Sequence, residues 1–307
     1  MQASAFAPAS VGNVAIGFDI LGFAVDVLGD RVTVTRSATP GVSIAAVRGI
    51  AGELPREAAE NTAGRALLAM QEALRPGFGF ALEIDKGIPL GSGLGGSAAS
   101  AVGAVVAASA LLPEPCEPLE LLKFALAGEA VASGGRHVDN IAPSLYGGLV
   151  LTVGIDHPRV KQIPVPATIR AVIVRPHMFL ATARARAILR RSVELSDFVW
   201  QTANLAGFIS GCYTEDLDMI RASLEDVVIE PQRAALIPGF ADVRRSAIEA
   251  GALGCSISGA GPSMFAWALE AAAPAVLAAM RAAFARHSLA TDGWVVELRS
   301  AGARVIG

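Results

Sequence analysis

Residues 89–100, PLGSGLGGSAAS, are the part of the sequence whose residue types and spacing point most directly to chemistry. Glycines at positions 91, 93, 95 and 96 allow positive φ angles and leave several backbone N–H groups free on one side of the loop. The uncharged stretch behind them predicts a helix over 97–112, whose first turn would add unpaired N–H donors and partial positive charge. The segment therefore predicts an anion-binding loop, for which phosphate is the usual ligand.

Two better-known glycine loops fit this segment less well. A Walker A loop needs a Lys followed by Ser or Thr, and the segment has no Lys. Gly91, Gly93 and Gly96 satisfy the GxGxxG pattern, but a dinucleotide-binding unit then needs a second strand with an acid about 20 residues on. Here that interval holds a long helix and a Pro-Glu-Pro sequence. On this segment alone, a structural glycine turn remains the alternative.

The elements that would position the loop follow from the spacing of apolar residues. Residues 31–36, 42–47 and 80–85 alternate with the period of a half-buried strand, and a helix should run from Thr62 to Pro76. Further helices are predicted over 119–133 (ending at Gly134-Gly135), 182–191, 198–212, 217–228, 240–251 and 271–287, and further strands over 145–154, 169–174, 255–269 (with a glycine turn) and 293–300.

Short, hairpin-like strands interleaved with helices favour an α+β fold, with helices on one face of each sheet, over a doubly wound parallel sheet. The segment 154–168 is rich in proline and glycine and predicts the junction between two domains, 1–158 and 159–307.

Composition excludes several classes of protein. The chain is 53% hydrophobic and has a formal net charge of −3, so nothing attracts it globally to nucleic acid or anionic membranes. Three distant cysteines without CxxC spacing and four histidines without an HExxH motif argue against structural zinc and favour a reduced, cytoplasmic compartment. No signal peptide is expected, and the stretch 97–112 is shorter than the ~20 residues that span a membrane.

The full string PLGSGLGGSAAS resembles the phosphate loop of the GHMP kinases, the superfamily of galactokinase, homoserine kinase and mevalonate kinase. FAPASVGNVAIGFDILG at 6–22 resembles the N-terminal motif of this family, in the form found in homoserine kinases, and ISGAGPSMFA at 257–266 resembles the third motif. Three more blocks resemble homoserine kinases, at 128–148, 181–189 and 229–240. The blocks keep the family's order over essentially the whole chain.

One difference from the family lies in the loop itself. The family usually has GLGSSAA, whereas this chain has Gly96 in place of the first serine. The second serine, Ser97, is the one that the resemblance places near the metal, so we expect function to be retained.

The resemblance implies a two-domain fold, with an N-terminal domain like the second domain of ribosomal protein S5 and a C-terminal ferredoxin-like domain. It implies ATP-dependent phosphorylation of the side-chain hydroxyl of L-homoserine, a step of threonine biosynthesis, in the cleft between the domains. The alternatives are a GHMP kinase for mevalonate or a sugar, and a catalytically inactive relative that binds ligand. The only partner expected is the small-molecule substrate, with no nucleic acid and no membrane, and a homodimer is left open.

The resemblance also implies the residues that hold ATP and Mg²⁺. Ser97 and Glu129 would be the metal ligands; without the resemblance, Glu129 would be a residue on a solvated helix face. Asn61 matches the family's adenine-binding position, although alone it would be a helix cap. The expected nucleotide-binding set is Asn61, Pro89, Gly91, Ser92, Gly93, Leu94, Gly95, Gly96, Ser97 and Ala98.

Homoserine is a zwitterion, so its carboxylate needs arginine and its ammonium group needs an acid. Arg186 and Arg233 match the substrate arginines of homoserine kinases, and Asp19 matches the acid; mevalonate would have no ammonium group to pair with Asp19. Arg184 is two residues from Arg186, so which of these two arginines points inward stays open. The expected substrate set is Asn13, Asp19, His137, Asn140, Thr182, Arg186 and Arg233.

Two interpretations remain for the proton of the acceptor hydroxyl. Counting back from Gly147-Gly148 places Asn140 where mevalonate-type relatives have an Asp, and counting from VDN places Asp139 there. An amide cannot accept a proton at neutral pH, so with Asn140 in place the proton would pass to the γ-phosphate, which a loose transition state tolerates. We favour this mechanism without a base and expect Asn140, Glu129 and Ser97 to be the catalytic residues.

Overall fold

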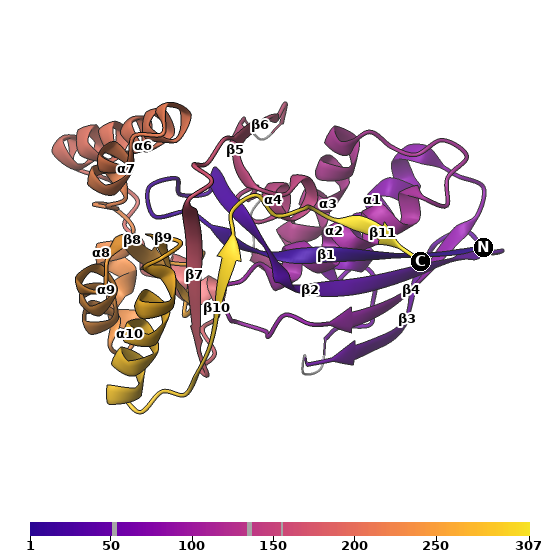
Figure 1. Cartoon of the computed structure of the whole chain (residues 1–307). Coiled ribbons are helices and arrows are strands. Elements are labelled where there is room, and N and C mark those ends of the chain that lie inside the picture. Colours follow the sequence, from indigo (N-terminus) through magenta and orange to yellow (C-terminus); the bar gives the residue numbers. More distant parts are fainter. Residues whose placement is uncertain (51–53, 134–136, 155) are drawn as a thin grey trace.

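The computed structural model describes residues 1–50, 54–133, 137–154 and 156–307, which form two β-sheets with helices packed against them (Figure 1). Strands and helices are interleaved along the chain, and all but one of the strand pairs are antiparallel. The expected α+β class is confirmed.

The first sheet has seven strands, in the order β11-β1-β2-β4-β3, with β5 on β2 and β6 on β5. Among the strand pairs that the structure describes, only β3 with β4 is parallel. Side chains alternate between the two faces, so that Val32 and Val34 are buried while Arg31 and Thr35, which flank them, are exposed. The strands are β1 (Gln2–Gly12), β2 (Leu21–Ser37), β3 (Val42–Gly49), β4 (Gly79–Lys86), β5 (Leu149–Val153), β6 (Arg159–Ile163) and β11 (Arg304–Ile306).

Helix α2 (Gly96–Ser109) packs against this sheet at β1 and β2 and is buried from Ala98 to Ser109. Its small side chains let the backbones approach closely; a Cβ at Gly103 would come within 2.9 Å of Val32. The helix predicted over 97–112 is therefore confirmed, although it ends three residues earlier. Its neighbours are α1 (Thr62–Leu74), α3 (Pro118–Ser133) and α4 (Ile141–Tyr146). The predicted end of α3 at Gly134-Gly135 lies outside the described residues.

The second sheet is antiparallel, in the order β10-β7-β9-β8. Helices α9 and α10 pack together against it, which gives the β-α-β-β-α-β arrangement expected of a ferredoxin-like unit. Its elements are β7 (Ile169–Pro176), α9 (Phe240–Glu249), β8 (Ala252–Ile257), β9 (Met264–Leu269), α10 (Ala273–Arg286) and β10 (Thr291–Glu297). Between β7 and α9 lie α5 (Thr182–Ala187), α6 (Leu195–Thr214), α7 (Leu217–Ser223), α8 (Glu230–Arg233) and the 3₁₀ turn η1 (Ala234–Leu236).

The other face of the second sheet packs against the first sheet. The ring of Phe23, on β2, lies edge-on to Phe265 and Trp267 of β9, with centroids 5.7 and 6.2 Å apart. Phe208 of α6 also packs against Trp267, with the ring centroids 5.0 Å apart. These residues belong to one hydrophobic cluster that includes the core under α2, so the two units share a core.

The domain division expected at residues 158/159 falls inside a β-hairpin. β5 and β6 pair from Leu149↔Ile163 to Val153↔Arg159, so both belong to the first sheet. β11 returns to the same sheet beside β1. The chain therefore leaves the first sheet after Ile163 and rejoins it at Arg304. The end of the first structural unit is set by the backbone pairing of β5 with β6 and not by the proline-rich composition of residues 154–168.

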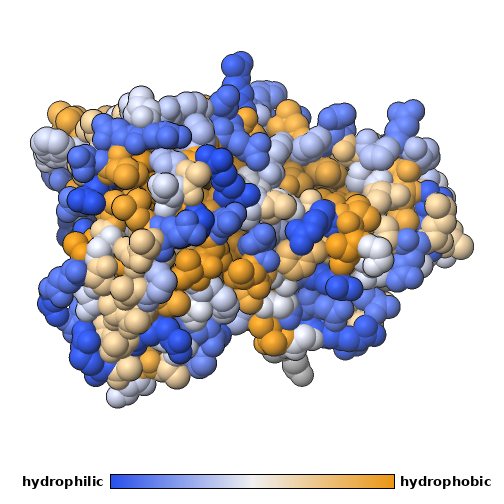
Figure 2. All heavy atoms as spheres, viewed as in Figure 1, coloured by the Kyte–Doolittle hydropathy of each residue, from blue (hydrophilic) through white to orange (hydrophobic). Residues whose placement is uncertain are grey.

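The surface mixes residue types. Figure 2 shows hydrophobic and hydrophilic residues interspersed over the face in view. Among the helices that the structure describes, none is long and apolar enough to cross a membrane.

Candidate active site

A cavity of about 370 Å³ lies where the glycine loop before α2, the loop between β1 and β2, and the starts of α4 and α5 meet. It brings together residues that are more than 200 positions apart in the sequence. Of the predicted site residues, it is lined by Asn13, Asp19, Pro89, Gly91, Ser92, Gly93, Leu94, Gly95, Gly96, Ser97, Glu129, His137, Asn140, Thr182, Arg186 and Arg233, and not by Asn61 or Ala98.

The glycine loop has the geometry of an anion-binding site. Gly91, Gly93 and Gly95 have φ angles of 60°, 76° and 68°, in the left-handed region that other residues rarely adopt. Gly95 is the N-cap of α2, and no side chain caps the N–H groups of the first turn. These N–H groups are thus available to a ligand at the positive end of the helix dipole.

The third motif packs directly against this loop. Ser258 Oγ donates a hydrogen bond to the carbonyl oxygen of Gly93 at 2.7 Å, and the backbone N–H of Ser263 donates to Ser92 O at 3.2 Å. A Cβ at Gly93 would lie 2.6 Å from the carbonyl oxygens of Ser258 and Gly261. The loop needs glycine here because another backbone lies against it.

A hydroxyl and a carboxylate meet at the start of α2. Ser97 Oγ donates to Glu129 Oε2 at 2.8 Å, so α2 and α3 bring the two predicted metal ligands together. Two neighbouring ligands of an octahedral Mg²⁺ ion lie about 2.9 Å apart, so the pair fits such an ion. Among the described residues, no group of three or more His, Cys, Asp or Glu side chains could hold a metal alone. An ion held here would need phosphate oxygens and water to complete its ligands.

At the other end of the cavity, Asp19 lies between the side chains of Arg186 and His137. Arg186 donates to both of its carboxylate oxygens, at 2.6 and 3.2 Å, and His137 Nδ1 lies 3.3 Å away. Burial acts to raise the pKa of Asp19, but the hydrogen bonds and charges of His137 and Arg186 outweigh it and lower the pKa to about 2. Asp19 is therefore ionised across the physiological range.

Arg233 lies beside this group, and its side chain is almost fully buried, with 2% of its surface exposed. Its Nε donates to Ala185 O at 3.1 Å and its Nη1 donates to Gly259 O at 2.9 Å. The Phe18 ring lies 5.2 Å from the Arg233 guanidinium and 5.4 Å from that of Arg186. Burial, followed by the charge of Arg186, lowers the pKa of Arg233 to about 10, so it stays charged at neutral pH. Sequence reasoning missed Phe18, although it directly precedes Asp19 in the GFD string.

The loop between β1 and β2 adopts an unusual backbone. Asn13, Val14 and Ala15 have φ angles of 71°, 43° and 59°, and Asp19 has 64°. Such angles cost energy in residues other than glycine and are common at functional sites. Asn13 fixes the loop, because its Nδ2 donates to Gly259 O at 2.9 Å and its Oδ1 accepts from the Asp19 N–H at 3.1 Å.

Asn140 and Asp139 are both in the cavity but face different surroundings. Asn140 Oδ1 accepts a hydrogen bond from Ser10 Oγ at 3.0 Å and lies 3.0 Å from the position of a Cβ on Gly95, beside the glycine loop. Asp139 is 4% exposed, and its Oδ1 has no hydrogen-bond partner among the described residues. Burial, followed by the negative charge of Asp19, raises the pKa of Asp139 to about 6.

Arg184 and Arg186, both on helix α5, lie in different surroundings. Arg186 lines the cavity, whereas Arg184 is exposed. The segment before α5 contacts the glycine loop: the Leu180 N–H donates to Gly91 O at 3.1 Å, and a Cβ on Gly91 would meet the Phe179 ring. Phe179 lines the cavity although 66% of its surface is exposed, and nothing in the sequence pattern indicated it.

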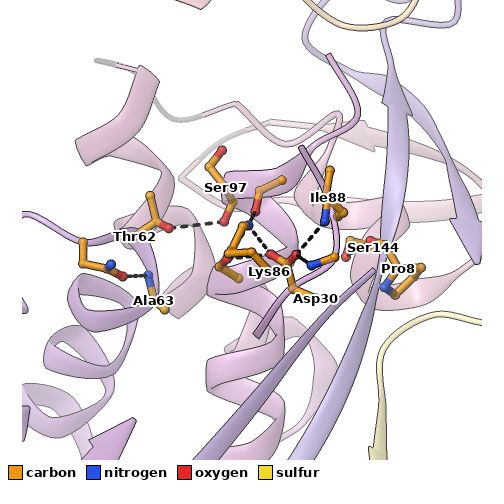
Figure 3. Close-up of polar contacts among 12 residues, drawn as sticks. Pro8, Asp30, Thr62, Ala63, Lys86, Ile88, Ser97 and Ser144 are labelled. Carbon is orange, nitrogen blue, oxygen red and sulfur yellow. Dashed lines mark hydrogen bonds and ion pairs between the residues drawn. The ribbon is translucent and has the colours of Figure 1, made fainter. Parts of the chain in front are cut away.

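Asn61 lies outside the cavity and caps α1. Its Oδ1 accepts from the N–H groups of Ala63 and Gly64, and its Nδ2 donates to Pro55 O at 2.9 Å. The helix-cap interpretation of Asn61 is therefore confirmed, and its role toward adenine stays a prediction. Thr62, the next residue, reaches Ser97 O at 3.4 Å, as Figure 3 shows.

The sequence and the structure are similar to those of known proteins. The model of the GHMP kinases N-terminal domain matches residues 61–148, and that of the GHMP kinases C-terminal domain matches residues 208–286. A homoserine kinase from Xylella fastidiosa (strain 9a5c) is 54% identical over 99% of this chain and 94% of its own length. One from Chlorobaculum tepidum is 44% identical over 98% of this chain and 97% of its own length. The crystal structure of homoserine kinase from Cytophaga hutchinsonii superimposes with a TM-score of 0.95 at 44% identity, covering 99% and 97% of the two chains.

Proposed function

Because this chain belongs to the homoserine kinases of the GHMP kinase family, we propose that it transfers the γ-phosphoryl group of ATP to the side-chain hydroxyl of L-homoserine. The proposal rests mainly on the groups that line a single cavity. An uncapped helix start that suits phosphate lies at one end, and the charged groups Asp19, Arg186 and Arg233, which suit an amino acid, lie at the other.

ATP binds with its phosphates on the glycine loop. The free N–H groups of the first turn of α2 and the positive φ angles of Gly91, Gly93 and Gly95 support this placement. The phosphoryl-transfer transition state is loose, so catalysis depends mainly on positioning and on neutralising charge. The glycine loop contributes to both with backbone groups, since no lysine is among the described residues that line the cavity.

Ser97 and Glu129 would hold Mg²⁺, which would supply positive charge beside the transferred phosphate. Their 2.8 Å separation and the hard oxygen chemistry of the pair support this assignment. Glu129 is carried by α3 and Ser97 by α2, and the two helices pack together.

Homoserine binds with its ammonium and carboxylate groups among Asp19, Arg186 and Arg233. Without substrate, Arg186 and Asp19 pair with each other, so a zwitterion inserted here exchanges an internal ion pair for two pairs with the ligand. Asp139, with its partnerless Oδ1, adds a second acceptor for the ammonium group. Asn13, His137 and Thr182 complete the surroundings.

The acceptor hydroxyl lies beside Asn140, the member of the Asp139–Asn140 pair that adjoins the glycine loop. Asn140 orients the hydroxyl but cannot take its proton, which passes to the transferred phosphate. The position of Asp139 near Asp19, His137 and Arg186 supports a role at the amino-acid end rather than as the base.

A screen of phosphate acceptors with ATP and Mg²⁺ tests the proposal. L-Homoserine should be phosphorylated at least about a hundredfold more efficiently than mevalonate or galactose, since each charged hydrogen bond to the zwitterion is worth ~1.5–3 kcal/mol. Comparable turnover of mevalonate would reject homoserine as the substrate while retaining a kinase. No turnover of any acceptor by folded protein would support the inactive, ligand-binding alternative.

A further inference from the structure

Asp30 and Lys86 are charged residues on the inward, otherwise apolar face of two neighbouring strands. On β2, Asp30 shares this face with Val32, and on β4, Lys86 shares it with Ile84. β2 and β4 are antiparallel, with Val32 opposite Ile84, so the same register places Asp30 opposite Lys86. Their side chains are 0% and 1% exposed and form a salt bridge. The ion pair therefore lies within the core, beneath the start of α2.

Lys86 ties the end of the glycine loop to this pair. Its Nζ donates to Asp30 Oδ2, to Gly96 O at 2.6 Å and to Ser100 Oγ at 2.8 Å (Figure 3). An ammonium group has three N–H donors, so all of them are used. Gly96 is the first residue of α2 and Ser100 lies one turn further, so Lys86 holds the turn whose N–H groups face the cavity.

Asp30 ties the beginning of the same loop. Its Oδ1 accepts from the backbone N–H groups of Gly87 and Ile88, at 3.0 and 3.2 Å, and its Oδ2 also accepts from Ser100 Oγ at 2.7 Å. Both ends of the loop from Gly87 to Gly96 are thus bound to one buried ion pair. An apolar pair of equal volume could fill the space but would leave these backbone groups without partners.

We propose that Asp30, Lys86 and Ser100 form an anchoring cluster, which positions the glycine loop and so sets the affinity of the site for the nucleotide phosphates. This inference rests on the proposed function for the identity of the ligand. None of the three residues lines the cavity, so they act through the loop as positioning residues. The glycines give the loop its conformational freedom, and the anchoring cluster restricts it to one conformation.

The test measures nucleotide binding separately from homoserine binding. Lys86→Met alone would leave the charge of Asp30 buried and unpaired, so the main variant is the neutral double variant Asp30→Asn/Lys86→Met. It retains an oxygen for Gly87 and Ile88 but loses the bond to Gly96. We expect the Kd for Mg·ADP, measured by calorimetry, to rise at least about tenfold, while the KM for homoserine changes less than about twofold. Ser100→Ala, which removes only a hydroxyl, should raise the Kd for Mg·ADP about threefold.

Arg48→Met is the matched control, because Arg48 forms an exposed ion pair with Glu83 in the same sheet. It should leave both affinities unchanged. A purely structural cluster would lower the melting temperature of the variants without changing the Kd for Mg·ADP at low temperature, and that result would overturn the inference. If the double variant does not fold, an unchanged Kd of the Ser100→Ala variant for Mg·ADP would also overturn the inference. Wild-type protein that binds Mg·ADP but does not phosphorylate homoserine would reject the proposed function and leave the inference standing.

Discussion

Asp19 and Asp139 are two carboxyl groups in one cavity whose surroundings move their pKa values in opposite directions. Burial acts to raise the pKa of Asp19, but the interactions with His137 and Arg186 outweigh it and lower the pKa to about 2. Burial, followed by the charge of Asp19, raises the pKa of Asp139 to about 6, and one of its oxygens has no hydrogen-bond partner in the described part of the chain. The first carboxylate is a fixed charge, whereas the second can lose or gain a proton near neutral pH.

Asp139→Asn should therefore stabilise the substrate-free protein at pH 8. The folded-state pKa of Asp139 lies above its unfolded value of 3.8, so ionised Asp139 costs stability above pH 6, and the cost vanishes as the pH falls below 4. The shift corresponds to about 2–3 kcal/mol, to be measured by urea unfolding at pH 8 and at pH 4. Equal stability of variant and wild type at pH 8 would contradict this account.

The same variant tests the mechanism without a base. Asp139→Asn should lower kcat less than about tenfold and act mainly by raising the KM for homoserine. A loss of kcat of about 10²–10⁴-fold with unchanged KM would instead identify Asp139 as the general base.

Glu129→Gln should keep the fold and lower kcat by roughly a hundredfold, because a neutral amide is a poor Mg²⁺ ligand. Part of the activity should return as the magnesium concentration is raised. Glu120→Gln, at an exposed position on the same helix, is the control and should behave as wild type. Wild-type activity of Glu129→Gln at ordinary magnesium would mean that another group holds the metal.

Among the elements, those with a clear apolar pattern could be predicted, whereas an end set by a local side-chain hydrogen bond could not. The helices α1 and α2 and the strand β4 follow from residue pattern alone. β1 was recognised only as a motif, because its second half is buried on both faces and does not alternate. The helix predicted over 217–228 ends at Ser223, since the Asp226 carboxylate accepts from three following backbone N–H groups and turns the chain.

Motifs predicted most of the residues that line the cavity, but they did not predict the anchoring cluster. Asp30 and Lys86 do leave a signal, a charge in the apolar register of each of two strands, but only the pairing of β2 with β4 makes them partners. Phe18 and Phe179 carry no chemical signature in the sequence, so their places in the site depended on the tertiary structure.

Helix α5 places the side chain of Arg186 in the cavity and leaves that of Arg184 exposed, and this difference can be tested. Arg186→Leu should raise the KM for homoserine by about ten- to a hundredfold and leave the KM for ATP nearly unchanged. Arg184→Leu, whose side chain is exposed, should change neither. If Arg184→Leu were the damaging variant, the arginine that binds substrate would be two residues earlier than proposed.

At the scale of the whole molecule, the two sheets share a core around Trp267, Phe23 and Phe208. The cavity lies between units that are packed together, which keeps the groups proposed to bind phosphate and those proposed to bind the amino acid in a fixed relation. A homodimer stays a prediction.

The shared core should make the two units unfold together. Trp267→Ala, in a fully buried position, should destabilise the protein by about 3–5 kcal/mol while unfolding remains a single transition by both circular dichroism and calorimetry. Trp200→Ala, at a position 64% exposed, is the control and should cost little. Two separate transitions in the wild type would show that the units are independent.

The pairing of β1 with β11 joins residues near opposite ends of the sequence, with Ser4 opposite Ile306. During synthesis at roughly 5–20 residues per second, the outer edge of β1 waits about 15 s to a minute for this partner. An unpaired strand edge is a template for pairing with another chain. Nascent chains on neighbouring ribosomes are therefore open to intermolecular strand pairing until β11 has been made, and we expect a chaperone that covers β1 during that interval to raise the yield of folded enzyme.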